Sequence, residues 1–228
     1  MLPRETLATA QIPGGDTLTL ISHGRDFVIM LGRDELMGTR MQFSEEQLAE
    51  LTLAELARPA PRVLIGGYGM GFTFRAALVH AGEGASVTVA EVVPEILDWA
   101  RGPLAELTGE TLSDPRGEVV LCDVAALIDD ANDGTTAKYD AILLDVDNGP
   151  DGIVRDANFR IYSKTGLGKA RDALRPGGIL AVWSAAPDHK FTMRLKESGF
   201  DVEVREVRAR PNNKGPRHTI WFARKRSA

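Results

Sequence analysis

The pattern of hydrophobic and polar residues changes at about residue 62. From there to residue 223, short and nearly continuous apolar runs alternate with longer segments in which apolar residues recur at helical spacing. Continuous apolar runs are typical of parallel strands whose two faces are both covered by helices. The pattern predicts strands at 62–66, 87–91, 118–122, 140–145, 178–184, 201–207 and 218–223, and helices at about 71–81, 93–107, 123–131, 163–174 and 187–197.

The last two predicted strands are separated only by the short loop RPNNKGPR. A loop of this length cannot hold a crossover helix, so these strands should pair antiparallel at one edge of the sheet. Strand–helix units followed by such a hairpin are the layout of a class I methyltransferase fold rather than of a dehydrogenase. The predicted fold is therefore α/β, with a Rossmann-like, seven-stranded and mostly parallel sheet, an antiparallel C-terminal hairpin and a small N-terminal β segment.

The N-terminal segment has a different pattern. Between residues 16 and 31, TLTLIS and FVIML flank HGRD, which predicts a β-hairpin with Gly24 in its turn. Ser44 opens SEEQ, a capping-box pattern that predicts the start of a helix, and the prolines of RPAPR end that helix. We therefore expect a small β-hairpin plus helix segment at 1–60 and a Rossmann-like nucleoside-binding transferase domain at 61–228.

A glycine-rich loop, in RVLIGGYGMGFT, joins the first buried strand to the next helix. This arrangement lets the backbone come close to a ligand that carries a nucleoside. Gly67, Gly69 and Gly71 form a GxGxG pattern, which taken alone also suits any tight strand-to-helix turn. The residues at the following strand ends decide between these interpretations.

Each of the next three strands ends in or before an acidic residue, namely Glu91, Asp123 and Asp145. Ligands of such sheets bind at the carboxyl ends of the strands, where an acid can accept hydrogen bonds from ribose hydroxyls. We favour that role for Glu91 over a solvated strand end. Asp123 equally suits an adenine contact and the N-cap of the following helix.

Asp145 is the strongest catalytic candidate. It ends the apolar run AILL, where burial makes a charge costly, so turn formation alone does not explain it. Asp147 and Asn148 follow in VDNGP and are tentative substrate-binding residues, although turn chemistry explains the Asn-Gly-Pro part of that segment. An acidic site of this kind fits a cationic or zwitterionic acceptor.

Composition narrows the class of protein. The formal net charge of −5 argues weakly against general nucleic-acid binding. A single cysteine, Cys122, excludes an internal disulfide, and the isolated histidines lack the spacing of a metal site. The sequence has no signal-peptide pattern and no apolar stretch of membrane-spanning length, so we expect a cytoplasmic protein that contacts neither membrane nor nucleic acid.

Several motifs together resemble the spermidine synthase (aminopropyltransferase) family within the class I S-adenosylmethionine-dependent methyltransferase superfamily. They are LIGGYGMGFT, AEVVPEILDWAR, LCDVAAL, YDAILLDVDNGP, IYSKTGL and LRPGGILAVWS, and they cover nearly the whole chain. The resemblance implies a transferase that is usually dimeric and uses S-adenosylmethionine or its decarboxylated form as co-substrate, without a metal. It also implies that the three glycines of the loop and Glu91 hold the nucleoside, that Asp123 contacts adenine, and that Asp145 deprotonates the attacking amine.

The chain departs from the family pattern at three places. Gly69 stands where family members carry an aspartate for the aminopropyl amine, and Asn148 stands where they carry a second aspartate for the diamine. DELMGTRMQFSEE replaces the segment with a YHE-type motif that closes over the polyamine. The elements that recognise a dicationic amine are therefore missing or altered.

Three functions follow from these observations. The whole-chain resemblance favours an aminopropyltransferase, the altered amine-binding positions favour a methyltransferase acting on a small molecule, and a nonenzymatic relative is the third. Tyr162 is a further tentative residue of the acceptor site. The basic residues at 208–218 suit either a grip on an anionic substrate group or, as we favour, a solvated hairpin tip.

Overall fold

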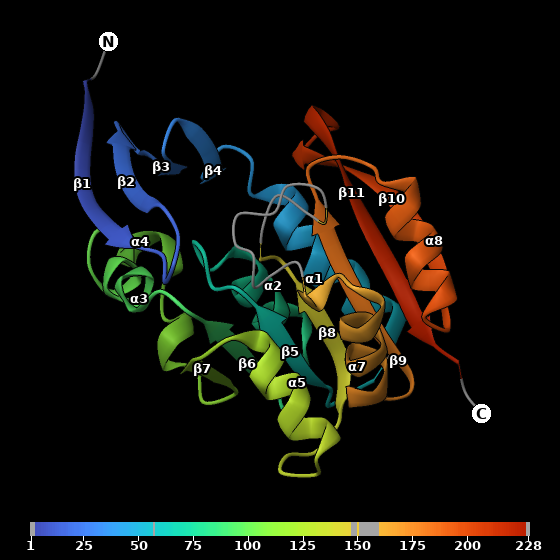
Figure 1. Cartoon of the computed structure of the whole chain (residues 1–228). Helices are drawn as coiled ribbons and strands as arrows, with labels where there is room; N and C mark the ends of the chain where they lie inside the picture. Colours follow the sequence, from blue (N-terminus) through green and yellow to red (C-terminus); the bar gives the residue numbers. More distant parts are fainter. Residues whose placement is uncertain (1–2, 57, 147–149, 151–159, 227–228) are drawn as a thin grey trace.

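The computed structural model describes residues 3–56, 58–146, 150 and 160–226, and it contains two β-sheets (Figure 1). The smaller sheet is antiparallel, in the order β1 (Arg4–Gln11), β2 (Thr17–His23), β3 (Asp26–Leu31) and β4 (Asp34–Gly38). The larger sheet has the order β10 (Phe200–Arg210), β11 (Lys214–Lys225), β9 (Leu174–Ser184), β8 (Tyr139–Leu144), β5 (Arg62–Gly66), β6 (Ser86–Glu91) and β7 (Gly117–Leu121).

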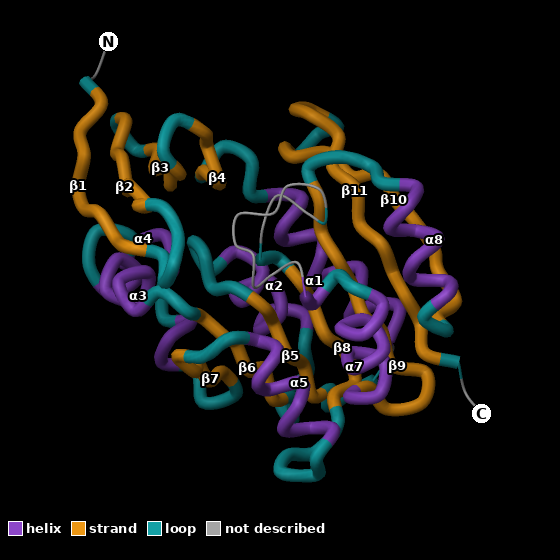
Figure 2. The backbone as a smooth tube through the Cα atoms, in the orientation of Figure 1, coloured by secondary structure: helices purple, strands orange, loops and turns teal. Residues whose placement is uncertain are grey.

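The large sheet has the predicted topology. Its strands from β9 to β7 are parallel to one another, and β11 pairs antiparallel with both β9 and β10. Figure 2 shows the helices alternating with these strands along the chain. They are α2 (Phe72–His80), α3 (Pro94–Arg101), α4 (Ala105–Thr108), α5 (Val124–Asn132), α7 (Lys164–Ala173) and α8 (His189–Glu197), preceded by α1 (Phe43–Leu56). The predicted fold class is confirmed.

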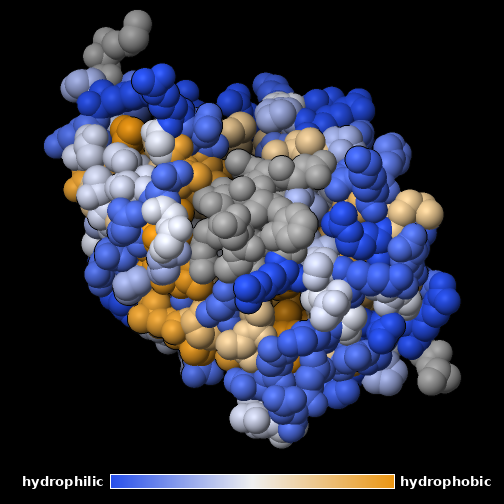
Figure 3. All heavy atoms as spheres, in the orientation of Figure 1, coloured by the Kyte–Doolittle hydropathy of each residue, from blue (hydrophilic) through white to orange (hydrophobic). Residues whose placement is uncertain are grey.

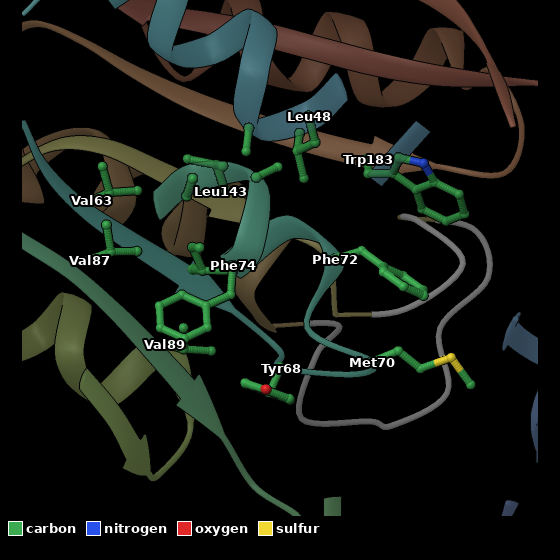
Figure 4. Packing of buried hydrophobic residues seen from close by; sticks show 14 of the residues in the cluster. Leu48, Val63, Tyr68, Met70, Phe72, Phe74, Val87, Val89, Leu143 and Trp183 are labelled. Carbon is green, nitrogen blue, oxygen red and sulfur yellow. The ribbon is translucent and has the colours of Figure 1, made fainter. Parts of the chain in front are cut away.

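The period-two alternation of the strands divides the core into two layers. In β5, Val63 and Ile65 belong to a cluster with residues of α1, α2 and α3, whereas Leu64 belongs to a cluster with residues of α5, α7 and α8. Successive side chains of a strand point to opposite faces, so a continuous apolar run supplies both layers. Figure 4 shows part of the first layer, in which Phe74 of α2 packs close to the β6 side chains.

The predicted N-terminal hairpin is present, with Gly24 at a positive φ of 69° in the turn between β2 and β3. It is extended by β1 and β4, which the sequence did not reveal because most β1 side chains are exposed and lack apolar alternation. The buried side chains of this sheet, such as Leu20 and Ile29, belong to the same hydrophobic cluster as α1 and α2. The two sheets therefore share one continuous core.

Two local predictions were wrong. The helix expected at 93–107 is divided into α3 and α4, because Pro103 disfavours helical geometry at Gly102. The helix expected to be capped by Ser44 instead begins at Phe43, and the Ser44 hydroxyl contacts side chains of the large sheet. None of the described helices has the length and apolar character of a membrane-spanning segment.

Helix α1 packs against α2 and against β8, β9, β10 and β11 of the large sheet. It therefore carries the end of the N-terminal segment across to the face of the large sheet that α2 also covers. The division of the chain into a segment at 1–60 and a domain at 61–228 stays a prediction.

Candidate active site

A cavity lies where the carboxyl ends of the parallel strands face the N-terminal sheet. Its empty space is about 910 Å³, open solvent at its mouth included. Figure 3 shows hydrophobic side chains gathered on this side of the molecule, whereas the surface over β10 and α8 is mostly hydrophilic. The described lining residues are Ile12, Leu18, Ile29, Leu36, Met37, Glu45, Gly67, Gly69, Ala90, Glu91, Val92, Val93, Ile96, Cys122, Asp123, Val124, Asp145, Val146 and Trp183.

The glycine loop after β5 forms part of the cavity floor. Gly67 has a φ of 84°, and a Cβ atom there would lie 2.7 Å from the backbone oxygen of Asp145. A larger residue would therefore push the loop away from the end of β8. Gly67 and Gly69 line the cavity, whereas Gly71 caps the start of α2 and is not among the described lining residues.

Glu91 holds the glycine loop and the start of the next connection in place. Its Oε2 accepts a hydrogen bond of 2.9 Å from the amide of Tyr68, and its Oε1 accepts from the amides of Val92 and Val93 at 2.7 and 2.8 Å. A carboxylate has about four acceptor positions, so three amides leave roughly one for a ligand hydroxyl. Glu91 thus organises the cavity in addition to lining it.

Asp123 is the N-cap of α5, which was one of its two predicted roles, and it also lines the cavity. Its Oδ1 accepts a hydrogen bond of 3.0 Å from the amide of Ala125, which caps α5, and its side chain belongs to the cavity wall beside Cys122. The cap fixes the orientation of the carboxylate. An adenine contact by Asp123 stays a prediction.

Asp145 follows β8 directly and lines the cavity. The hydroxyl of Thr73, in the first turn of α2, donates a hydrogen bond of 2.7 Å to its Oδ2. Loss of water around the carboxylate raises the pKa of Asp145 to about 6, and the hydrogen bond from Thr73 opposes that rise. A carboxylate with a pKa near neutrality suits proton transfer at physiological pH.

Glu45 is a second acid in the cavity, and the sequence did not single it out. It lies in the first turn of α1, is only 7% exposed and lines the same cavity as Asp145. Burial raises the pKa of Glu45 well above its usual value, and the charges of Asp145 and Glu46 raise it further. Glu45 is visible as an acid in the SEEQ pattern, but an acid near the start of a helix more often stabilises the helix dipole than binds a ligand.

Trp183 also lines the cavity, at the end of β9 (Figure 4). Its indole N–H donates a hydrogen bond of 3.1 Å to Oγ of Ser44, which lies 2.7 Å from Nδ1 of His218. Its ring packs edge-on against the His218 ring. Burial lowers the pKa of His218, which favours the neutral imidazole. This buried network fixes the cavity-facing indole between α1 and β11.

Met37 lies against Gly69, the position at which the family pattern has an aspartate. A Cβ atom at Gly69 would lie 2.5 Å from the methyl carbon of Met37, and Gly69 has a φ of 54°. The wall formed by the N-terminal sheet is otherwise made of isoleucine and leucine side chains. An apolar surface therefore faces the loop at this point.

Tyr162 was a tentative residue of the acceptor site. Tyr162 is 2% exposed in the core layer of α5, α7 and α8, where its ring packs edge-on against Phe191, and it is absent from the described cavity wall. Asp147 and Asn148 lie outside the described residues.

The basic residues at 208–218 belong mostly to the paired strands β10 and β11 rather than to a loop. Arg217 is exposed and pairs with Glu206 at 2.8 Å, and Arg208 donates to the backbone oxygen of Gly215 at 2.9 Å. None of these basic residues is among the described lining residues of the cavity.

Comparisons with known proteins agree with this geometry. The sequence is 30% identical over 162 residues to the polyamine aminopropyltransferase of Saccharolobus islandicus strain L.S.2.15, covering 71% of this chain and 50% of the relative. It is 29% identical to that of Saccharolobus solfataricus, with the same coverage, and 32% identical over 128 residues to that of Mycobacterium tuberculosis strain H37Rv, covering 56% of this chain and 23% of the relative. The chain thus spans about half the length of the curated Saccharolobus relatives. No protein-family profile matches the sequence.

Solved structures show the same fold. A spermidine synthase from Thermotoga maritima superposes with a TM-score of 0.75 at 19% identity, covering 96% of this chain and 72% of the other. A spermidine synthase in complex with the transition-state analogue AdoDATO superposes with a TM-score of 0.73, also at 19% identity and with the same coverage. The predicted resemblance to the spermidine synthase family is therefore confirmed in sequence and in fold.

Proposed function

We propose that this spermidine synthase-like chain is an aminopropyltransferase, which moves an aminopropyl group from decarboxylated S-adenosylmethionine to an amine by in-line displacement. The observation that carries the proposal is Asp145, held by the Thr73 hydroxyl in a cavity that also contains the glycine loop and Glu91. In this proposal, the glycine loop and Glu91 bind the nucleoside and Asp145 contacts the reacting amine. The names of the sequence relatives support the same reaction.

In the proposed reaction, the Asp145 carboxylate takes a proton from the acceptor ammonium. The freed lone pair of the amine nitrogen attacks the carbon next to the sulfonium, a C–N bond forms, and the C–S bond breaks with its electron pair going to sulfur. Sulfur leaves as a neutral thioether, methylthioadenosine, and the product nitrogen carries the positive charge. Because the sulfonium is already a good leaving group, the protein mainly supplies position and exclusion of water.

The charges in the cavity favour the decarboxylated donor. The charged residues of its described wall are all acidic, namely Glu45, Glu91, Asp123 and Asp145, and no described lining residue is Lys, Arg or His. S-adenosylmethionine carries a carboxylate that would need a positive or hydrogen-bonding partner. Its decarboxylated form carries only cationic groups in the same region and so suits an acidic wall.

The structure and the relatives disfavour the two other functions that the sequence allows. A small-molecule methyltransferase is disfavoured by the acidic wall and by the names of the relatives. A nonenzymatic relative is disfavoured because an acid buried with a raised pKa costs stability unless it has a use.

The acceptor in this proposal is a small-molecule amine or a zwitterion. A role in polyamine biosynthesis, a homodimer and a cytoplasmic location belong to the same proposal and rest on the family resemblance. Light scattering of the purified protein measures the oligomer directly, and a monomer at micromolar concentration would contradict the dimer.

Calorimetric titration with S-adenosylmethionine, its decarboxylated form and methylthioadenosine tests the donor. We expect the decarboxylated form to bind more tightly than the carboxylated one, with methylthioadenosine also binding. Tighter binding of S-adenosylmethionine would support methyl transfer instead, and no binding of any of the three would contradict both enzymatic functions.

Asp145→Asn tests the base. We expect turnover with decarboxylated S-adenosylmethionine and putrescine to disappear, because the amide cannot accept the proton, while methylthioadenosine affinity changes less than about twofold. Asp129→Asn is the matched control, since Asp129 is an exposed residue of α5 that pairs with Lys169 at 2.8 Å. A large loss of methylthioadenosine affinity in Asp145→Asn would show that Asp145 serves the nucleoside instead.

A further inference from the structure

The carboxyl group of Glu45 is buried in the cavity without a described partner. Glu45 as a residue is more than nine-tenths buried, and no hydrogen bond or ion pair to its side-chain oxygens occurs within residues 3–56, 58–146, 150 and 160–226. Buried carboxyl groups are normally paired or hydrogen-bonded because removing them from water is costly. An unpartnered carboxyl that lines a cavity is therefore poised for a ligand.

The neighbouring carboxylate on the same helix has a different environment. Glu46 pairs with Arg75 of α2 at 2.7 Å, and Arg75 also donates to the backbone oxygen of Leu107. This guanidinium is therefore engaged, and it is not part of the described cavity wall. Glu45 and Glu46 thus differ in one respect that matters: only Glu45 faces the cavity.

Thr73 links Glu45 to Asp145. Its hydroxyl lies 2.7 Å from Oδ2 of Asp145 and 3.2 Å from the backbone oxygen of Glu45. The first turn of α1 is therefore fixed against the end of β8, and the two acids line one part of the cavity. A single positively charged group bound there would interact with both carboxylates.

We propose that Glu45 binds the ammonium group of the acceptor together with Asp145 and supplies the negative charge that Asn148 lacks. The acceptor site is then built from the start of α1, which belongs to the segment DELMGTRMQFSEE, and from the end of β8. This inference rests on the proposed aminopropyl transfer and names the group that would hold its acceptor. Asp145 takes the proton, and Glu45 stays beside the nitrogen and stabilises the positive charge on the product.

Ligand binding should change the protonation of this pair. Without a cation nearby, two carboxyls in a poorly solvated cavity retain a proton, and the raised pKa values of both groups agree with this. A bound ammonium favours the doubly ionised pair, so a proton leaves to solvent and acceptor affinity rises with pH.

The other titratable groups described near Glu45 do not supply the positive charge that its carboxylate would pair with. Glu46 on the same helix is paired with Arg75 of α2. On the side of β11, His218 contacts Ser44, and burial favours its neutral form. Glu91 and Asp123 of the cavity wall are both acidic.

The test compares Glu45→Gln with Glu46→Gln, a matched loss of one carboxylate from the same helical turn. Putrescine is titrated calorimetrically into each variant saturated with methylthioadenosine, at pH 6, near the pKa of about 6 for Asp145, and in two buffers of different ionisation enthalpy. We expect wild type and Glu46→Gln to bind putrescine equally within twofold and to release a proton. Glu45→Gln should bind at least tenfold more weakly and release less, with methylthioadenosine affinity alike in all three proteins.

Glu45→Asp keeps the charge and should recover part of the putrescine affinity, and thermal unfolding shows that each variant is folded. Putrescine binding by Glu45→Gln within twofold of wild type would overturn the assignment. So would an equal loss of methylthioadenosine affinity, since it would indicate a structural role. If the wild-type protein does not bind methylthioadenosine, the proposed transferase function fails. If it binds methylthioadenosine but Glu45→Gln does not weaken putrescine binding, only the assignment of Glu45 fails.

Discussion

Replacing Thr73 with valine removes a hydroxyl group while keeping a side chain of nearly the same shape. That hydroxyl donates to Oδ2 of Asp145 at 2.7 Å and thereby stabilises the charged form of the carboxylate. Without it, this bond no longer opposes the desolvation that raises the pKa of Asp145. The substitution should therefore raise the pKa above the wild-type value of about 6.

The size of this effect follows from the strength of the bond. A hydrogen bond to a charged group contributes about 1.5–3 kcal/mol, and about 1.4 kcal/mol corresponds to one pKa unit. The pKa of Asp145 should therefore rise by about one to two units. At pH 7, the ionised fraction then falls from roughly nine-tenths to between roughly one-half and one-tenth, which lowers kcat/KM about two- to tenfold.

The assay is the pH dependence of kcat/KM for putrescine with decarboxylated S-adenosylmethionine as donor. We expect the acid limb of the Thr73→Val profile to move to higher pH and the activity to approach that of wild type above about pH 9. Thr73→Ser keeps the hydroxyl and should superimpose on wild type. A Thr73→Val profile that coincides with wild type, or one reduced equally at every pH, would refute the reasoning.

Three further predictions concern the walls of the cavity. Glu91→Gln replaces one accepting oxygen of the carboxylate that holds the glycine loop with a donor. Calorimetry should then show that methylthioadenosine binds at least about tenfold more weakly, and an unchanged affinity would rule out the nucleoside role of Glu91. Gly69→Asp introduces the family aspartate but places a side chain at positive φ against Met37. Urea unfolding should therefore show that the free energy of unfolding falls by about 1–2 kcal/mol, and Met37→Ala in the same chain should recover part of this loss. Equal stability of the single and double variants would refute the clash. Ser44→Ala removes the hydrogen-bond partner of the His218 imidazole and of the Trp183 indole. Urea unfolding should show that the free energy of unfolding falls by about 1–3 kcal/mol, and wild-type stability would mean that water replaces the hydroxyl.

The sequence determined the large sheet almost completely. In β5, the run Val63-Leu64-Ile65 supplies one core layer with two side chains and the other layer with one, and only a strand covered on both faces requires such a run. The short loop after β10 required an antiparallel pair because no helix fits into it. The acids at the strand ends could also be placed, because parallel strands end at the same edge of a sheet.

Local pattern was insufficient where an element is held by distant contacts. The strands β1 and β4 were missed because they belong to a sheet that faces solvent over much of its surface. Tyr162 was predicted to line the acceptor site, whereas its ring packs against Phe191 in the core layer of α5, α7 and α8, outside the described cavity wall. Sequence position beyond a strand does not specify the direction of a side chain.

Only the tertiary structure decided which groups meet in the cavity. The sequence determined that Asp145 ends a buried strand and that α1 is a helix with acids in its first turn. It could not determine that α1 crosses to the large sheet and brings Glu45, but not Glu46, into the cavity with Asp145. The physical reason is that hydrophobic periodicity specifies which face of an element is buried, whereas the neighbour of that face depends on how the elements pack together.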